Sequence, residues 1–99
     1  MVKHITMYQL SNKSMEGFVV EQLKKLEECP LIVKNRICVS FEKNLPIIGK
    51  PIFADIVYIA YFYDEDGAKM FPICQEHLDL VEEISPYVEN VMSIDFIDE

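Results

Sequence analysis

The segment that most constrains the fold of this chain is IFADIVYIAYFY, residues 52–63. It is rich in β-branched and aromatic residues, which favour strands, and apart from Asp55 it is apolar at successive positions rather than at every second one. A strand that is apolar on both faces must be covered on both sides. We therefore predict that this strand lies in the interior of a sheet.

The rest of the chain predicts an α+β fold around that strand. Alternating apolar residues predict further strands at 2–10, 34–42 and 88–97. Helical spacing predicts a helix over 15–28 with Ser14 as its N-cap, and a second helical region after the turn DEDG. Pro72 should kink that second region, because proline lacks an amide hydrogen. The order β-α-β-β-α-β is that of the ferredoxin-like split βαβ fold, a four-stranded antiparallel sheet with its helices on one face.

Such a sheet has one face without helices, which bears on the oligomeric state. The 99 residues make one domain, 1–99, whose core is small enough to benefit from a partner subunit. A large exposed apolar patch is rare on soluble monomers. We therefore predict a homodimer in which two sheet faces pack together into an α/β barrel.

Charge and composition exclude several classes of partner. The net charge is −8, with +3 on residues 1–50 and −11 on residues 51–99. An acidic surface repels phosphate, so we expect neither nucleic acid nor an anionic membrane as a partner. No apolar run approaches a membrane span and the first residues do not resemble a secretory signal, so we expect a cytoplasmic protein.

The cysteines argue against a disulfide framework. Cys29, Cys38 and Cys74 form no C-x-x-C pair, so we expect reduced, buried thiols and no zinc ribbon. No metal and no cofactor is predicted.

His77 is the most informative polar residue of the second helical region. At 100° per residue it lies near the middle of an apolar arc made of Met70, Ile73, Cys74, His77, Leu80, Val81 and Ile84. The neighbouring carboxylates lie outside that arc, so His77 should point toward the sheet. Three interpretations remain open: a hydrogen-bonded core residue, a general base or ligand-binding group in an apolar pocket, and a metal ligand together with Cys74.

The end of the chain, FADIVYIAYFYDEDGAKMFPICQEHLDLVEEISPYVENVMSIDF, together with the opening MVKHITMYQL, resembles the stress-responsive A/B barrel (Dabb) domains. The resemblance covers nearly the whole chain. It is carried by His4 in the first strand, Asp55 entering the third, His77 after the kink and Asp95 in the last strand. It implies a ferredoxin-like fold that dimerises through its sheets.

The resemblance also implies a candidate site. Plant polyketide cyclases of this family carry out an aldol cyclisation between sheet and helices, where the equivalent of His77 is the base and a tyrosine six residues earlier supplies a hydroxyl. Here that earlier position is Phe71, and Gln75 stands where the family usually has proline. The cyclase constellation is therefore incomplete. Three tyrosines on the strands are candidates to replace the hydroxyl, or else core or interface aromatics: Tyr8, Tyr58 and Tyr61.

Two function hypotheses follow from different classes. The first is a non-enzymatic dimeric barrel with a role in stress tolerance or in binding a small molecule. The second is a cofactor-independent enzyme acting on a hydrophobic carbonyl compound, with His77 as base and His4 orienting the substrate. Oxygen chemistry with or without haem rests on fold analogy alone. An enzyme needs His77 to line a cavity reachable from solvent, whereas a structural histidine would be packed shut.

Four further residues are predicted to line a pocket or bind a ligand: Phe71, Cys74, Tyr8 and Asp55. Asp55 also has a structural interpretation, which we favour: it either caps a turn or pairs with Lys50 or Lys3. Asp95 is interpreted in the same way as a residue at a strand edge facing water.

Overall fold

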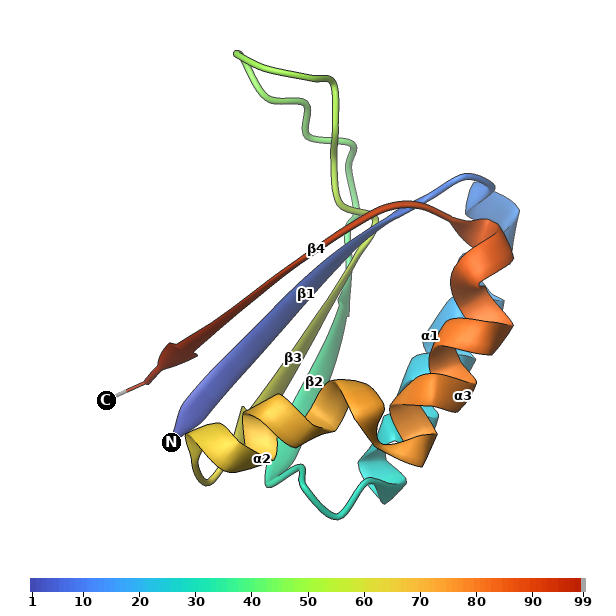
Figure 1. Cartoon of the computed structure of the whole chain (residues 1–99). Coiled ribbons are helices and arrows are strands. Elements are labelled where there is room, and N and C mark those ends of the chain that lie inside the picture. The colour runs from blue at the N-terminus through green and yellow to red at the C-terminus, as the bar shows by residue number, and fades with distance from the viewer. Residues whose placement is uncertain (99) are drawn as a thin grey trace.

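The structure is a computed structural model that describes residues 1–98. Its strands are β1 (Val2–Leu10), β2 (Lys34–Val39), β3 (Ile56–Phe62) and β4 (Val88–Ile97). Its helices are η1 (Lys13–Met15), α1 (Glu16–Lys24), η2 (Lys25–Glu28), α2 (Glu65–Met70), η3 (Phe71–Ile73), α3 (Gln75–Ile84) and η4 (Ser85–Tyr87). The helices lie on one side of the sheet (Figure 1). This is the predicted ferredoxin-like fold.

The sheet is antiparallel with strand order β2-β3-β1-β4, so β3 and β1 are its interior strands. The prediction that the most apolar segment forms an interior strand is confirmed. Register between the strands determines which side chains share a face: His4 on β1 lies opposite Ala60 on β3 and Asp95 on β4. The β1–β4 pairing thus brings together residues from the two ends of the chain.

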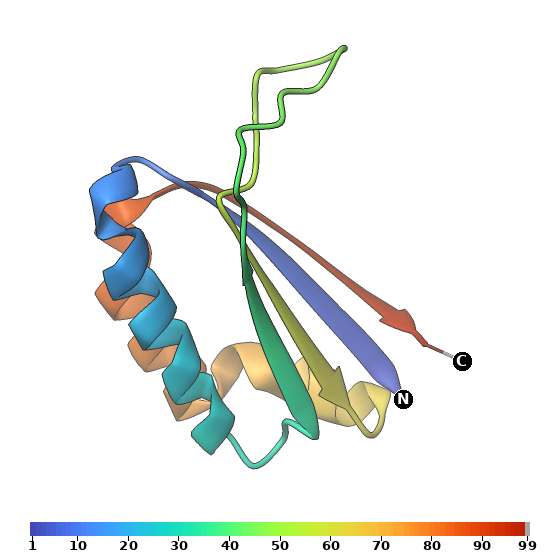
Figure 2. The same cartoon turned by 180° about the vertical axis from the view of Figure 1, so that it is seen from behind.

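The β2–β3 connection is longer than predicted. β2 ends at Val39 and β3 begins at Ile56, and the segment between them projects away from the body of the molecule (Figures 1 and 2). Prolines at 46 and 51 interrupt the extended pairing, because proline has no amide hydrogen for a ladder. The base of this loop is closed by the Ser40 amide, which donates to the Asp55 carbonyl at 2.9 Å.

The first helical region begins earlier than predicted. Asn12, not Ser14, is the N-cap: its side-chain oxygen accepts from the Ser14 amide at 3.0 Å at the start of η1. The second helical region is broken at Pro72, as expected, by the short 3-10 segment η3. Proline fits there as an early residue of a new turn, where its missing amide hydrogen leaves no broken bond.

The kink also changes the apolar arc predicted around His77. Met70 and Ile73 are exposed, because residues before and after the break do not share one helical phase. Val81, on α3 itself, is also exposed. The face of α3 that packs inward is narrower, consisting of His77, Leu80 and Ile84, with Cys74 at its start. His77 itself is half-buried.

The core lies between the sheet and the helices. On β1 this core includes Val2, Tyr8 and Leu10. The residues that alternate with these along β1 lie on the other face of the sheet, here called the open face, and the register shows which residues of β3 and β4 share that face. The apolar side chains of that open face are Ile5, Met7, Val57, Ile59, Met92, Ile94 and Phe96. Met92 and Ile94 are 63% and 56% exposed, so a substantial apolar surface is left without helices.

Candidate functional site

Two histidines and a phenylalanine from three elements form the centre of the candidate site. The ring centroids of His4, on β1, and Phe71, on η3, are 5.5 Å apart, and those of Phe71 and His77, on α3, are 4.9 Å apart. Both pairs are edge-on, a favoured arrangement for aromatic rings. The kink at Pro72 positions Phe71, which is 2% exposed, between the two imidazoles.

His4 is held in a chain of polar side chains that crosses from β1 to β4. Its Nδ1 lies 2.6 Å from Asp95 Oδ1, and its Nε2 lies 2.6 Å from Thr6 Oγ1. Thr6 Oγ1 in turn lies 2.9 Å from Ser93 Oγ. The strand register explains the chain, since His4 is opposite Asp95 and Thr6 is opposite Ser93, all on the helix side of the sheet.

The chemistry of these groups determines the direction of the hydrogen bonds. An ionised carboxylate only accepts, so the His4 Nδ1–H donates to Asp95. In the neutral imidazole Nε2 then accepts the Thr6 hydroxyl hydrogen, and the Thr6 oxygen accepts from Ser93. A carboxylate orients an imidazole, and the imidazole polarises a hydroxyl, which is the arrangement used to activate a hydroxyl in nucleophilic catalysis.

His77 is held by a separate hydrogen bond, to the backbone of the kink. Its Nδ1–H donates to the Pro72 carbonyl at 3.0 Å, which leaves Nε2 as the unprotonated nitrogen. Burial lowers the pKa of His77 from its usual 6.5, the Pro72 carbonyl opposes this shift and the nearby His4 adds to it. At neutral pH His77 is therefore an uncharged imidazole with a free basic nitrogen.

A hollow of ≈ 380 Å³ lies beside these residues, between α2 and the end of β4. Its walls are Val2, Glu65, Ala68, Lys69, Pro72, Asp95, Phe96 and Ile97. They include Pro72, which accepts from His77, and Asp95, which accepts from His4. The lining thus includes the residue that each histidine is hydrogen-bonded to, and neither His4 nor His77 is among the lining residues.

The tyrosines do not supply the hydroxyl that Phe71 lacks. Tyr8 and Tyr58 are buried in the core, and burial raises both pKa values, that of Tyr58 to about 12. Tyr61 lies on the open face, between the ammonium groups of Lys3 and Lys34. The hydroxyl adjacent to an imidazole is that of Thr6. We did not predict Thr6, although its position two residues after His4 on a strand, and so on the same face, was a usable signal.

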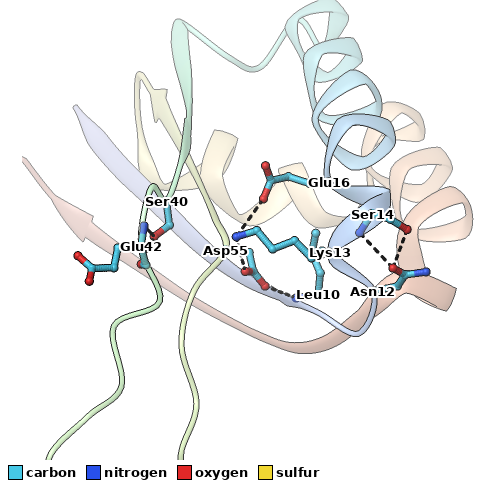
Figure 3. Close-up of polar contacts among 8 residues, drawn as sticks. All are labelled: Leu10, Asn12, Lys13, Ser14, Glu16, Ser40, Glu42 and Asp55. Carbon is cyan, nitrogen blue, oxygen red and sulfur yellow. Dashed lines mark hydrogen bonds and ion pairs between the residues drawn. The ribbon is translucent and has the colours of Figure 1, made fainter.

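Asp55 lies away from the histidines and joins three segments (Figure 3). Its Oδ2 accepts from the Leu10 amide at 2.8 Å, and its Oδ1 lies 3.6 Å from Lys13 Nζ. The predicted partners, Lys50 and Lys3, were wrong. Asp55 is 4% exposed, and it ties the end of β1 to the start of β3.

Cys74 contacts a second cysteine. Its Sγ lies 3.4 Å from Cys29 Sγ, at the end of η2. It therefore borders the seam between η2 and α3, and its nearest metal-ligating neighbours there are Cys29 and Glu76 rather than the predicted partner His77.

A sequence model of the stress responsive A/B barrel domain matches residues 2–98. The chain belongs to the stress responsive A/B barrel domain (Dabb) family. The landmark residues His4 and Asp95 of this Dabb chain are the pair that the β1–β4 register brings into contact. No curated protein matches its sequence.

Solved structures with the same fold are similar to this Dabb protein at low identity. A dimeric ferredoxin-like protein of unknown function from Thermobifida fusca is 17% identical with a TM-score of 0.76, covering 98% of this chain and 90% of that one. A Dabb family protein from Mesorhizobium loti is 16% identical with a TM-score of 0.74, covering 99% and 96%. The hydroxynitrile lyase from Passiflora edulis is 14% identical with a TM-score of 0.75, covering 99% and 93%.

Among the described residues of this Dabb protein, no helix has the length and apolarity needed to cross a membrane.

Proposed function

We propose that this Dabb protein is a homodimer that binds a small hydrophobic carbonyl compound beside His4 and His77, in a stress-related or other binding role. The observation that carries the proposal is the hollow of ≈ 380 Å³, whose lining includes Asp95 and Pro72, the residues to which the two histidines are hydrogen-bonded. Its apolar lining residues suit an apolar ligand, and Lys69 and Asp95 in the same lining provide polar groups that would orient one.

The open face of the sheet supports the dimer. Its central apolar side chains, Ile5 and Ile59, adjoin Ile94 on the edge strand β4 and are flanked on β1 and β2 by Lys3, Lys34 and Arg36. An apolar centre with polar residues at its border is typical of a protein interface. The similar structures from Thermobifida fusca and Bacteroides fragilis are described as dimeric. Pairing two such faces would complete an α/β barrel.

A second candidate function is cofactor-independent acid–base catalysis with His77 as general base. It is favoured by the geometry of His77: its Nδ1 proton is committed to Pro72, and its lowered pKa keeps Nε2 unprotonated at neutral pH. In this mechanism Nε2 would take a proton next to the ligand carbonyl. Among the described residues, those that line the hollow do not include His4 or His77. Catalysis would therefore require a small outward movement of α2 or η3.

The test is an NMR titration of both histidines, repeated with a library of small aromatic and polyketide-like carbonyl compounds. Binding predicts that the His77 and His4 ring resonances shift with one class of compound. His77→Ala should then keep the dimer and lose that response. Turnover of a bound compound that disappears in His77→Ala would favour the enzyme. Histidine ring resonances that do not shift with any compound would contradict both functions.

A further inference from the structure

The seam between η2 and α3 contains a cluster of metal-ligating side chains that is separate from the histidines. Cys29 Sγ, Cys74 Sγ and a Glu76 carboxylate oxygen lie within 4.8 Å of one another. Cys29 lies directly after η2, Cys74 is the N-cap of α3, and Glu76 is in the first turn of α3. The two helices pack against each other, which brings together cysteines 45 residues apart in the chain.

We propose that Cys29, Cys74 and Glu76 form a binding site for a thiophilic divalent metal ion of the zinc class. Two thiolates and one carboxylate, with water in the fourth position, make a tetrahedral set that suits this ion. Binding displaces one proton from each thiol to water, and each sulfur then donates an electron pair to the metal. No oxidant or reductant is needed.

The separation of the sulfur atoms favours a metal over a disulfide. The two Sγ atoms are 3.4 Å apart, whereas tetrahedral bonds of about 2.3 Å place two sulfur ligands about 3.8 Å apart. A metal would therefore require a small adjustment. A disulfide, at about 2.05 Å, would require the sulfurs to close by more than 1 Å.

The cluster is partly shielded from solvent. Cys29 is 2% exposed, and a metal bound there would take the place of its thiol proton. Cys74 is half-buried at the N-terminal end of α3.

A hollow of ≈ 280 Å³ adjoins the cluster through Glu76. Five carboxylates and one ammonium group, that of Lys25, line it. The excess of negative charge raises the local concentration of cations, and the hollow provides both an entry path and the water ligand.

The experiment is a titration of the reduced protein with Co²⁺, followed by displacement with Zn²⁺. We expect one Co²⁺ per chain, with thiolate-to-cobalt charge-transfer absorption in the near ultraviolet that Zn²⁺ abolishes. Cys74→Ser should lose this absorption and still fold, because serine is a preferred N-cap residue. Glu76→Gln should weaken binding about 10-fold or more. Cys38→Ser, which alters the half-buried cysteine of β2, is the matched control and should bind like the wild type.

Three results would overturn the site: no charge-transfer absorption in the folded, reduced protein, the same absorption in Cys74→Ser as in the wild type, or loss of the absorption in Cys38→Ser. A Cys29–Cys74 disulfide that forms readily with oxidised glutathione in a protein that takes up no Co²⁺ would instead assign the pair to thiol–disulfide exchange. None of these outcomes affects the histidine site, because the cluster shares no residue with it.

Discussion

Asp95 on β4 accepts a hydrogen bond of 2.6 Å from His4 on β1, across 91 positions of sequence. The same His4 ring contacts Thr6 on its other side. The imidazole is thus fixed at both nitrogens by residues of the sheet, while His77 is fixed at one nitrogen by the kinked helix. This difference between the two histidines determines which substitutions should affect each of them.

Thr6→Val should destabilise the fold by about 1–3 kcal/mol in chemical denaturation, because it leaves buried His4 Nε2 without a hydrogen-bond partner. Thr6→Ser keeps the hydroxyl and is the control, which should cost less. A loss of stability in Thr6→Ser with none in Thr6→Val would show that the methyl group, not the hydrogen bond, is what matters.

The stability of the protein should fall as the pH drops through the range in which His77 titrates. Its pKa is lower in the folded state than the usual 6.5, so the unfolded chain binds the proton more tightly. The free energy of unfolding is therefore highest above pH 6.5 and is lost as the pH falls from there through the folded pKa. Denaturation between pH 5 and 8 should show that this slope is smaller in His77→Gln. An unchanged slope would assign the pH dependence to other groups.

Phe71→Ala should destabilise by about 3–5 kcal/mol, because this ring is fully buried and separates the two imidazoles. Phe18→Ala should cost less, about 1–3 kcal/mol, since Phe18 is half-buried and packs edge-on against Tyr87. Urea denaturation measures both. A larger loss of stability for Phe18→Ala than for Phe71→Ala would mean that the Phe18 ring is more deeply buried in the folded protein than it is in the single chain.

Ile94→Asp should convert the proposed dimer to a monomer in sedimentation, because it places a charge among the apolar side chains of the open sheet face, opposite Ile5. Val81→Asp introduces the same charge at an exposed apolar residue of α3 and should leave the dimer intact. A wild-type protein that sediments as a monomer, or a Val81→Asp variant that dissociates as Ile94→Asp does, would exclude assembly through this face.

Much of the fold was predictable from local patterns. The continuous apolar run at 52–63 indicated the interior strand, and Pro72 indicated the break in the second helical region. The ends of β2 and β3 were predicted less well, because apolar residues in the projecting loop resemble a strand until the prolines interrupt pairing. The family resemblance also identified His4 and Asp95 from the sequence alone.

Residue type and spacing determined the order of the elements and the face on which each side chain lies, because strand and helix periods are local properties of the chain. They did not determine which elements become neighbours. Only the tertiary structure joined His4 to Asp95 and Thr6 to Ser93 through the β1–β4 register, and Cys29 to Cys74 through the packing of η2 on α3. These contacts depend on long-range packing, in which burying the apolar faces of the sheet and helices fixes the positions of polar groups far apart in the sequence.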